Sequence, residues 1–273
     1  MYLEGGGVPI QSSARESVQE VLKCLFWLLF PLIANSYMEK EMLIAKNITR
    51  EGPGLLEDLL KEHGIKYTIV DLNEGQIFPP VENYGAVVVL GGPDSANDEN
   101  DKMNNELARI RETRAVNIPY LGICLGLQTL VKASGGKVVR NSVKEIGFRD
   151  PENNRFTVDL TEEGKRDELF AGLDHTLRVF HLHGETVELT KDMMLLATGK
   201  FCQNQVVKIG SNAYGTQCHF ELTPKMFEIW INEDPDLLAL NNEKLRADFE
   251  STKEEYTQVG RKLLQNFLKI ARF

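Results

Sequence analysis

Residues 118–134 read IPYLGICLGLQTLVKAS, and the order of residue types in this stretch indicates the fold class. Residues 118–123 form an apolar run typical of a short buried strand, and the chain from residue 125 onward is typical of a helix. Gly122 and Gly126 flank Cys124 at the junction. Small residues at these two positions let the backbone turn sharply while the thiol is exposed at the carboxyl edge of a sheet. The stretch predicts a nucleophile elbow centred on Cys124.

The position of Cys124 has two interpretations. At a helix N-terminus, unpaired N–H groups and the partial positive charge of the helix favour the thiolate, which is the nucleophilic form. A cysteine after an apolar strand is also commonly a small core residue with no chemical role. The flanking glycines favour the nucleophile, but they do not decide the question without a partner base.

Strands and helices alternate around the elbow, which predicts an α/β fold with a mostly parallel, doubly wound sheet flanked by helices. Ligands of such sheets bind at the carboxyl ends of the strands. We expect strands at residues 42–48, 67–72 and 86–90 and helices at 55–63 and 102–114. Segments 155–160, 177–182, 205–209 and 213–220 have strand character and predict a small β subregion. A helical C-terminal extension follows from residue 223.

Composition excludes several classes of function. The 273-residue chain has a net charge of −9 and no run of basic residues, which argues against a nucleic-acid ligand. Its four cysteines show no C-x-x-C spacing, so we expect a reducing compartment, a cytoplasmic protein and no structural zinc. Residues 21–33 are too short an apolar run to span a membrane. No motif indicates a cofactor or another metal.

Three regions are expected along the chain. Residues 1–37 differ from the rest and predict a poorly ordered extension, a helix added to the domain, or a misassigned start, because Met38 would serve as a start codon. A signal peptide is a further alternative, although Glu16 and Glu20 offset Arg15 where a positive region is needed. Residues 38–224 form the expected catalytic domain, and residues 225–273 the helical extension.

A glycine-rich loop, GGPDS at residues 91–95, follows the expected strand at 86–90. It resembles the phosphate-cradling loop of ATP pyrophosphatases, but Leu90 replaces the leading serine of that motif. The loop could instead present backbone N–H groups to whatever Cys124 attacks, or it could be a plain tight turn.

A base for Cys124 is expected at His219. Glu221 lies two residues further on, and in an extended strand both side chains share one face, where a carboxylate can orient the imidazole. H-x-E is weak evidence alone. Combined with an elbow cysteine, it predicts a Cys124–His219–Glu221 triad.

These residues together resemble the class I glutamine amidotransferases of the triad type, and in particular the stand-alone proteins similar to the amidotransferase domain of GMP synthase. The resemblance spans about residues 42–224. The motifs that carry it are GGP at 91–93, GICLGLQ at 122–128, EIG at 145–147, HGE at 183–185, Gln205, and YGTQCHFE at 214–221.

The resemblance implies a role for each site residue. Cys124 would attack the side-chain amide of glutamine, His219 would move the protons, and Glu221 would orient His219. The backbone N–H groups of Gly92 and Leu125 would form the oxyanion hole. The resemblance also assigns substrate binding to Gln128, His183, Gly184 and Glu185.

The chain departs from the family pattern Q-F-H-P-E at Cys218 and Phe220. No acceptor domain follows the triad within the 273 residues. The leading hypothesis is therefore an amidohydrolase that releases ammonia from glutamine, and its possible partner is a separate synthetase subunit. A γ-glutamyl peptide hydrolase with the same triad and a non-catalytic binding or regulatory module remain alternatives.

Overall fold

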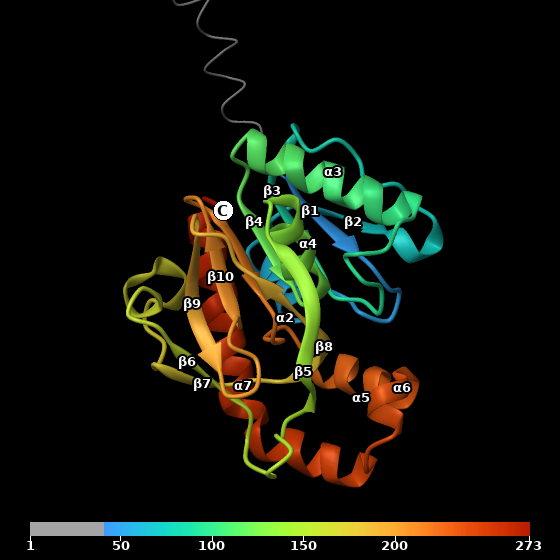
Figure 1. Ribbon diagram of the computed structural model, residues 1–273, viewed down its shortest axis with the longest axis vertical. Coiled ribbons are helices and arrows are strands. Elements are labelled where there is room, and N and C mark those ends of the chain that lie inside the picture. The colour runs from blue at the N-terminus through green and yellow to red at the C-terminus, as the bar shows by residue number, and fades with distance from the viewer. Residues whose placement is uncertain (1–40) are drawn as a thin grey trace, which may run out of the picture. The chain divides into compact units, whose positions relative to one another are not determined.

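A nine-stranded sheet forms the centre of the computed structural model, which describes residues 41–273 (Figure 1). The strand order is β2-β1-β3-β4-β11-β10-β9-β6-β7. The strands are β1 (Glu41–Lys46), β2 (Tyr67–Asp71), β3 (Tyr84–Val89), β4 (Tyr120–Ile123), β6 (Thr157–Leu160), β7 (Thr176–Arg178), β9 (Met193–Gly199), β10 (Val206–Ile209) and β11 (Ala213–Thr216). Strands β5 (Lys137–Gly147) and β8 (His181–Glu188) pair in a separate two-stranded sheet.

The first five strands of that order are parallel to one another, and the remaining four continue the sheet in antiparallel pairs. Strand β11 joins the two halves because it is parallel to β4 and antiparallel to β10. The carboxyl ends of β1, β3, β4 and β11 consequently lie at one edge, where the loops that follow them meet.

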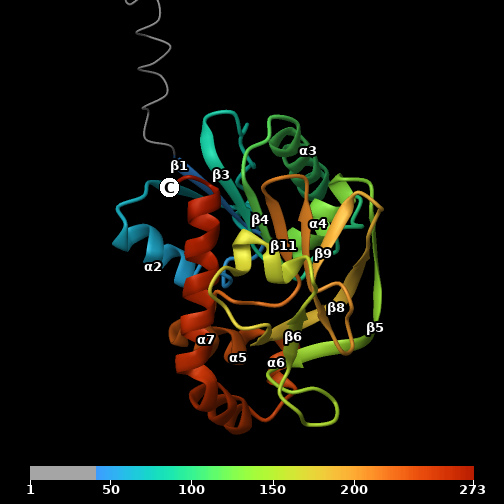
Figure 2. The ribbon, with the colours of Figure 1, turned by 90° about the vertical axis from the view of Figure 1, so that its left-hand side faces the viewer.

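Helices cover both faces of the sheet, as Figures 1 and 2 show. Alternate residues of β1 point to opposite sides: Met42 and Ile44 contact the core under α2 and α7, while Leu43 and Ala45 contact the core under α3 and α4. The helices are α2 (Leu55–Glu62), α3 (Asp101–Ala115), α4 (Leu125–Ala133), α5 (Pro224–Glu233), α6 (Pro235–Leu238) and α7 (Asn242–Ile270), with short 3-10 turns at Leu72–Glu74, Gly164–Arg166 and Glu168–Phe170. This arrangement confirms the α/β fold class, including the small β subregion and the C-terminal helices.

The structure differs from the sequence-based expectation mainly in the β subregion. Strands β5 and β9 were not expected, and the segment expected at 177–182 divides into the end of β7 and the start of β8. The strand expected at 213–220 ends at Thr216, because the chain then leaves the sheet and pairs at His219 with Phe180. Alternation of buried and polar residues in β5 is broken by a register shift between Arg140 and Glu145, which weakens the periodic signal.

Helix α7 supports the segment that carries His219. The Tyr256 hydroxyl donates a hydrogen bond to the carbonyl oxygen of His219 (3.0 Å) and accepts one from the backbone N–H of Leu222 (3.3 Å). One turn later, Gly260 lies so close that a Cβ there would be 2.1 Å from the carbonyl oxygen of Phe220. The helix backbone therefore touches the extended segment directly.

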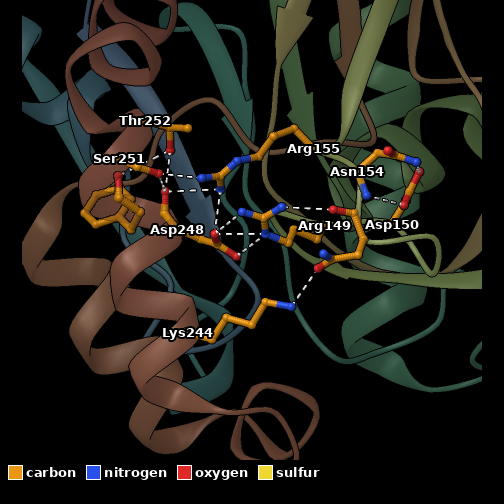
Figure 3. Close-up of polar contacts among 10 residues, drawn as sticks. Arg149, Asp150, Asn154, Arg155, Lys244, Asp248, Ser251 and Thr252 are labelled. Carbon is orange, nitrogen blue, oxygen red and sulfur yellow. Dashed lines mark hydrogen bonds and ion pairs between the residues drawn. The ribbon is translucent and has the colours of Figure 1, made fainter.

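The N-terminal half of α7 is attached to the loop after β5 through Asp248 (Figure 3). Its carboxylate accepts hydrogen bonds from Arg149 (2.8 and 2.9 Å) and lies 3.0 Å from Nη1 of Arg155, while Lys244 donates to Asn153 (2.7 Å). The Asp248 side chain is 8% exposed, so these charge-assisted bonds are poorly screened by solvent.

Within residues 41–273 the structure contains no helix that is long and apolar enough to cross a membrane. The expectations for residues 1–37 lie outside the described residues. The boundary expected at residue 224 stays a prediction.

Gly260→Ala is expected to lower the free energy of unfolding by roughly 1–3 kcal/mol. The new methyl group would clash with the backbone oxygen of Phe220, which cannot move away by changing a side-chain rotamer. Alanine gains about 1 kcal/mol of helix propensity over glycine, so the clash has to exceed that gain. Urea unfolding measures the difference, and Gln258→Ala on the exposed side of α7 is the control. A variant more stable than wild type would contradict the close contact.

The free energy of unfolding of Glu106→Gln, relative to wild type, is expected to increase as the pH rises from 5 to 8. Glu106 is fully buried in α3, and within the described part of the chain neither carboxyl oxygen has a hydrogen-bond partner. Burial raises the pKa of Glu106 from 4.5 to about 7. Because the folded state holds the proton more tightly, wild-type stability falls as the pH rises from about 4.5 to about 7, by at most about 3 kcal/mol. The glutamine side chain at position 106 of the variant is neutral throughout that pH range, so the variant does not lose stability in this way.

The measurement is urea unfolding of wild type and Glu106→Gln at pH 5 and pH 8. Glu112→Gln on the same helix serves as the control, because the Glu112 side chain is 40% exposed. An equal difference between wild type and Glu106→Gln at both pH values would show that Glu106 does not change its charge on folding.

Candidate active site

Cys124 sits at the tip of a strained turn between β4 and α4. Its backbone has φ 53° and ψ −104°, in the left-handed region that residues other than glycine rarely adopt. A Cβ on Gly122 would lie 2.1 Å from the carbonyl oxygen of Gly126, and a Cβ on Gly126 would lie 2.1 Å from that of Val89. Both glycines are therefore required by the close approach of strand and helix.

The thiol of Cys124 lies in a polar environment. Its backbone N–H donates to the carbonyl oxygen of Thr216 (2.7 Å), which joins the turn to β11. The Sγ atom lies 3.7 Å from the carbonyl oxygen of Leu182 and 3.6 Å from Nε2 of Gln217. The residue is 5% exposed.

His219 and Glu221 form a buried pair. Nδ1 of His219 lies 2.6 Å from Oε1 of Glu221, and Oε2 of Glu221 accepts the backbone N–H of Phe220 at 2.9 Å. The second carboxylate bond fixes the rotamer of Glu221, and the first leaves Nε2 as the ring nitrogen available to a substrate or thiol. The ring of Trp230 meets the imidazole edge-on, with 5.1 Å between the centroids.

Burial alone would lower the pKa of His219. The Glu221 carboxylate and the neighbouring Cys124 thiol outweigh burial, and together they hold the pKa of His219 well above its ordinary value. The protonated imidazole is thus the favoured form of His219. A thiolate–imidazolium pair is the reactive arrangement of a cysteine nucleophile.

Two backbone N–H groups beside Cys124 have no acceptor among residues 41–273. Leu125 is the first residue of α4, where no intrahelical bond is available, and Gly92 belongs to the loop after β3. No hydrogen bond between described residues uses either N–H group. The remainder of the GGPDS loop is fixed by Asp94, whose carboxylate lies 2.6 Å from Nζ of Lys102.

The residues that the family resemblance assigns to substrate binding also meet here. Nε2 of Gln128 donates to Oε1 of Gln217 (3.2 Å) and lies 3.4 Å from the carbonyl oxygen of Glu185. The Glu185 carboxylate accepts a hydrogen bond from Ser95 (3.1 Å), and Nδ1 of His183 lies 3.0 Å from the Glu185 carbonyl oxygen. These contacts join α4, β8 and the glycine loop.

Glu145, His181 and His183 form a buried group whose possible ligand atoms lie within 4.8 Å of one another. Oε2 of Glu145 lies 2.8 Å from Nε2 of His183 and accepts a hydrogen bond from Gln205 at 3.0 Å. Burial, and next the charges of His183 and His219, hold the pKa of His181 well below its ordinary value. Both ring nitrogens of His181 lack a hydrogen-bond partner among the described residues, and we assign no metal to the group.

A cavity of about 590 Å³ connects these elements. Seven of the expected site residues line it: Gly92, Cys124, Gln128, His183, Gly184, Glu185 and His219. Glu221 and Leu125 are not among the lining residues, and Glu221 contacts His219 at Nδ1.

Sequence reasoning missed much of the cavity wall. The missed residues include Arg50, Glu51, Arg140, Lys144, Asp234 and Asp236. Arg50 and Glu51 follow β1 at the carboxyl edge of the sheet, and that position could have identified them. Asp234 and Asp236 come from the C-terminal helices, and no local pattern in the sequence indicates that those helices reach the site.

Comparisons with known proteins identify the family of the chain. The profile of the family described as "Glutamine amidotransferase class-I" matches residues 54–233. The glutamine amidotransferase-like protein YfeJ of Salmonella typhimurium is 31% identical over 197 residues, which cover 69% of this chain and 80% of YfeJ.

A second relative is one of the subunits of the glutamine-hydrolysing GMP synthase of Saccharolobus solfataricus. It is 31% identical over 175 residues, which cover 62% of this chain and 86% of the relative. A glutamine amidotransferase structure from Thermotoga maritima superposes with a TM-score of 0.76 at 27% identity and covers 87% of this chain and all of that one. The chain therefore belongs to the class I glutamine amidotransferase family.

Proposed function

We propose that the protein hydrolyses the side-chain amide of glutamine through a thioester on Cys124. The observation that carries the proposal is the buried His219–Glu221 pair, joined at 2.6 Å, beside a cysteine held in a strained turn in the same cavity. Membership of a family of glutamine amidotransferases supports the reaction class.

In the proposed reaction, the Cys124 thiolate attacks the amide carbon, and negative charge develops on the carbonyl oxygen. The free N–H groups of Gly92 and Leu125 stabilise that oxyanion. Protonated His219 gives its proton to the nitrogen as the C–N bond breaks, and ammonia leaves. His219 then takes a proton from water, which attacks the thioester and releases glutamate. Glu221 keeps the imidazole oriented and stabilises its charge.

Recognition of the glutamyl part is proposed at Gln128 and at the segment His183, Gly184 and Glu185. These residues line the cavity on the side of α4 and β8, and their mutual hydrogen bonds fix their positions before substrate binds. A fixed site loses little conformational entropy on binding.

The ammonia is proposed to pass to a separate synthetase subunit or to be released. The relatives from GMP synthases are named as single subunits of those enzymes, which favours a partner chain that supplies the acceptor. Either fate of the ammonia leaves the chemistry at Cys124 unchanged.

A γ-glutamyl peptide hydrolase is the second candidate function. The observation that favours it is the cavity volume of about 590 Å³, which lies in the range of pockets that hold ligands far larger than one amino acid. The triad chemistry is the same for both candidates, since only the leaving group differs.

Cys124→Ser is expected to lower the release of ammonia from glutamine by at least about 1,000-fold, because serine lacks a stabilised anionic form beside His219. Ammonia and glutamate are measured with purified, reduced protein, and γ-glutamyl dipeptides are assayed in parallel. Faster cleavage of a dipeptide than of glutamine would favour the second candidate.

Cys202→Ser is the matched control for this experiment. Cys202 is buried, lies outside the cavity, and has its pKa raised to about 11 by burial, so it remains a thiol. Absence of turnover of every γ-glutamyl compound by wild type, with and without a synthetase, would favour the non-catalytic alternative.

Glu221→Gln is expected to slow alkylation of Cys124 by iodoacetamide about tenfold at pH 6–7. The Glu221 carboxylate raises the pKa of His219 against the opposing effect of burial, so its removal lowers that pKa and depletes the imidazolium that stabilises the thiolate. The midpoint of the alkylation profile should move to higher pH. Mass spectrometry of the peptide containing Cys124 gives the rate, with Glu255→Gln on the surface as the control. An unchanged profile would contradict the proposed thiolate–imidazolium pair.

A further inference from the structure

Glu51 is a buried carboxyl group on the wall of the active-site cavity. It lies in the turn between β1 and α2 and is only 5% exposed. That turn is attached to the proposed catalytic segment, because the backbone N–H of Leu55 donates to the carbonyl oxygen of Glu221 at 2.9 Å. The position of Glu51 relative to the triad is therefore fixed by backbone contacts.

The carboxyl group of Glu51 borders the same space as the nucleophile and the base. A Cβ built on Gly91 would lie 2.5 Å from Oε2 of Glu51, 3.4 Å from Cε1 of His219 and 3.5 Å from Cβ of Cys124. Three side chains thus converge on one point that only a glycine leaves open.

Glu51 differs from the other carboxylates that line the cavity, because each of those has a partner. Among the described residues, no hydrogen bond or ion pair involves the carboxyl group of Glu51. The partnered carboxylates and their partners are Glu185 with Ser95, Asp94 with Lys102, Asp234 with Arg50, and Asp236 with Lys144. A buried carboxyl without a partner is costly, and such groups collect at functional sites.

The neighbours of Glu51 place it on the side of the cavity where the leaving group departs. Arg50 pairs with Asp234 at 2.6 Å and accepts at its carbonyl oxygen a hydrogen bond from Trp230, the ring that contacts His219. The proposed glutamyl-binding residues belong instead to α4 and β8. His219 delivers its proton to the leaving nitrogen, so that nitrogen has to come next to the imidazole and hence to Glu51.

We propose that Glu51 is a catalytic residue whose carboxylate accepts a hydrogen bond from the nitrogen of the scissile amide as that nitrogen departs. This inference rests on the proposed amide hydrolysis. Glu51 makes and breaks no covalent bond: the C–N electron pair goes to nitrogen, His219 supplies the proton, and ammonia leaves with one of its N–H groups directed at Glu51. The interaction strengthens as positive character develops on the protonated nitrogen, which favours the transition state.

The ionisation of Glu51 is consistent with this role. Burial raises its pKa from 4.5 to about 7; His219 and Arg50 lower the pKa, and Glu221 and Asp234 raise it. The carboxylate is therefore the main form at pH 8, where the test is best made.

The test compares two substrates that differ in the leaving atom, glutamine and the γ-methyl ester of glutamate. The ester oxygen receives its proton from His219 and carries no other hydrogen, so it has nothing to donate to Glu51. Glu51→Leu should lower kcat/KM for glutamine about tenfold, because that is the effect of losing a hydrogen bond to a charged group. The kcat/KM for the ester should stay within about twofold of wild type. Glu51→Gln retains an uncharged hydrogen-bond acceptor, so its kcat/KM for glutamine should fall less than that of Glu51→Leu.

Glu106→Gln is the matched control, because Glu106 is equally buried with a pKa also raised to about 7 but lies outside the cavity. This variant should leave kcat/KM unchanged for both substrates. If Glu51→Leu lowers kcat/KM equally for both substrates, or does not lower it for glutamine, the role of Glu51 is overturned while the proposed amide hydrolysis stands. If wild type cleaves neither substrate, the proposed function itself fails, and the inference fails with it.

Discussion

The tight turn at Cys124 is the constraint on which the arrangement of the site depends. Strand β4 and helix α4 approach so closely that Gly122, Gly126 and Val89 leave no room for an added methyl group. The turn forces Cys124 to φ 53°, a conformation that costs free energy and that the surrounding core has to maintain. The turn also places Leu125, whose backbone N–H has no acceptor among residues 41–273, directly after Cys124. In the proposed reaction these neighbours are the nucleophile and one of the two donors to the oxyanion.

Buried charge is the second constraint. His219 and Glu221 are almost inaccessible to solvent, so their attraction is screened much less than that of a surface pair. Burial raises the pKa of the Glu51 carboxyl group to about 7, and by itself it would lower the pKa of the His219 imidazole, an effect that Glu221 outweighs. The cavity therefore brings a carboxyl group with a raised pKa close to an imidazole with a raised pKa.

The elbow, the fold class and the grouping of His219 with Glu221 could be predicted because each depends on short-range patterns. Gly122 and Gly126 indicate a turn that has no room for larger side chains. The uninterrupted apolar run in residues 86–90 indicates a strand that is buried on both faces of a sheet. Strand β5 was missed because its register shift breaks the alternation. Asp234 could not be assigned because it lies far from Arg50 in the sequence and pairs with it only through tertiary packing. Glu51 follows β1 at the carboxyl edge of the sheet, but no sequence pattern shows that its carboxyl group borders the same space as Cys124 and His219.

Helix α7 adds an order of events to this arrangement. The carbonyl oxygens of His219 and Phe220 contact Tyr256 and Gly260, residues that leave the ribosome after the whole triad has been made. Domains acquire their structure as the chain emerges, so the segment that carries His219 lacks one of its supports until α7 has been synthesised and has docked. A nascent chain that already contains Cys124, His219 and Glu221 consequently lacks one support of the segment that carries His219. In the proposed reaction, reactivity of Cys124 toward amides would begin only when folding is almost complete.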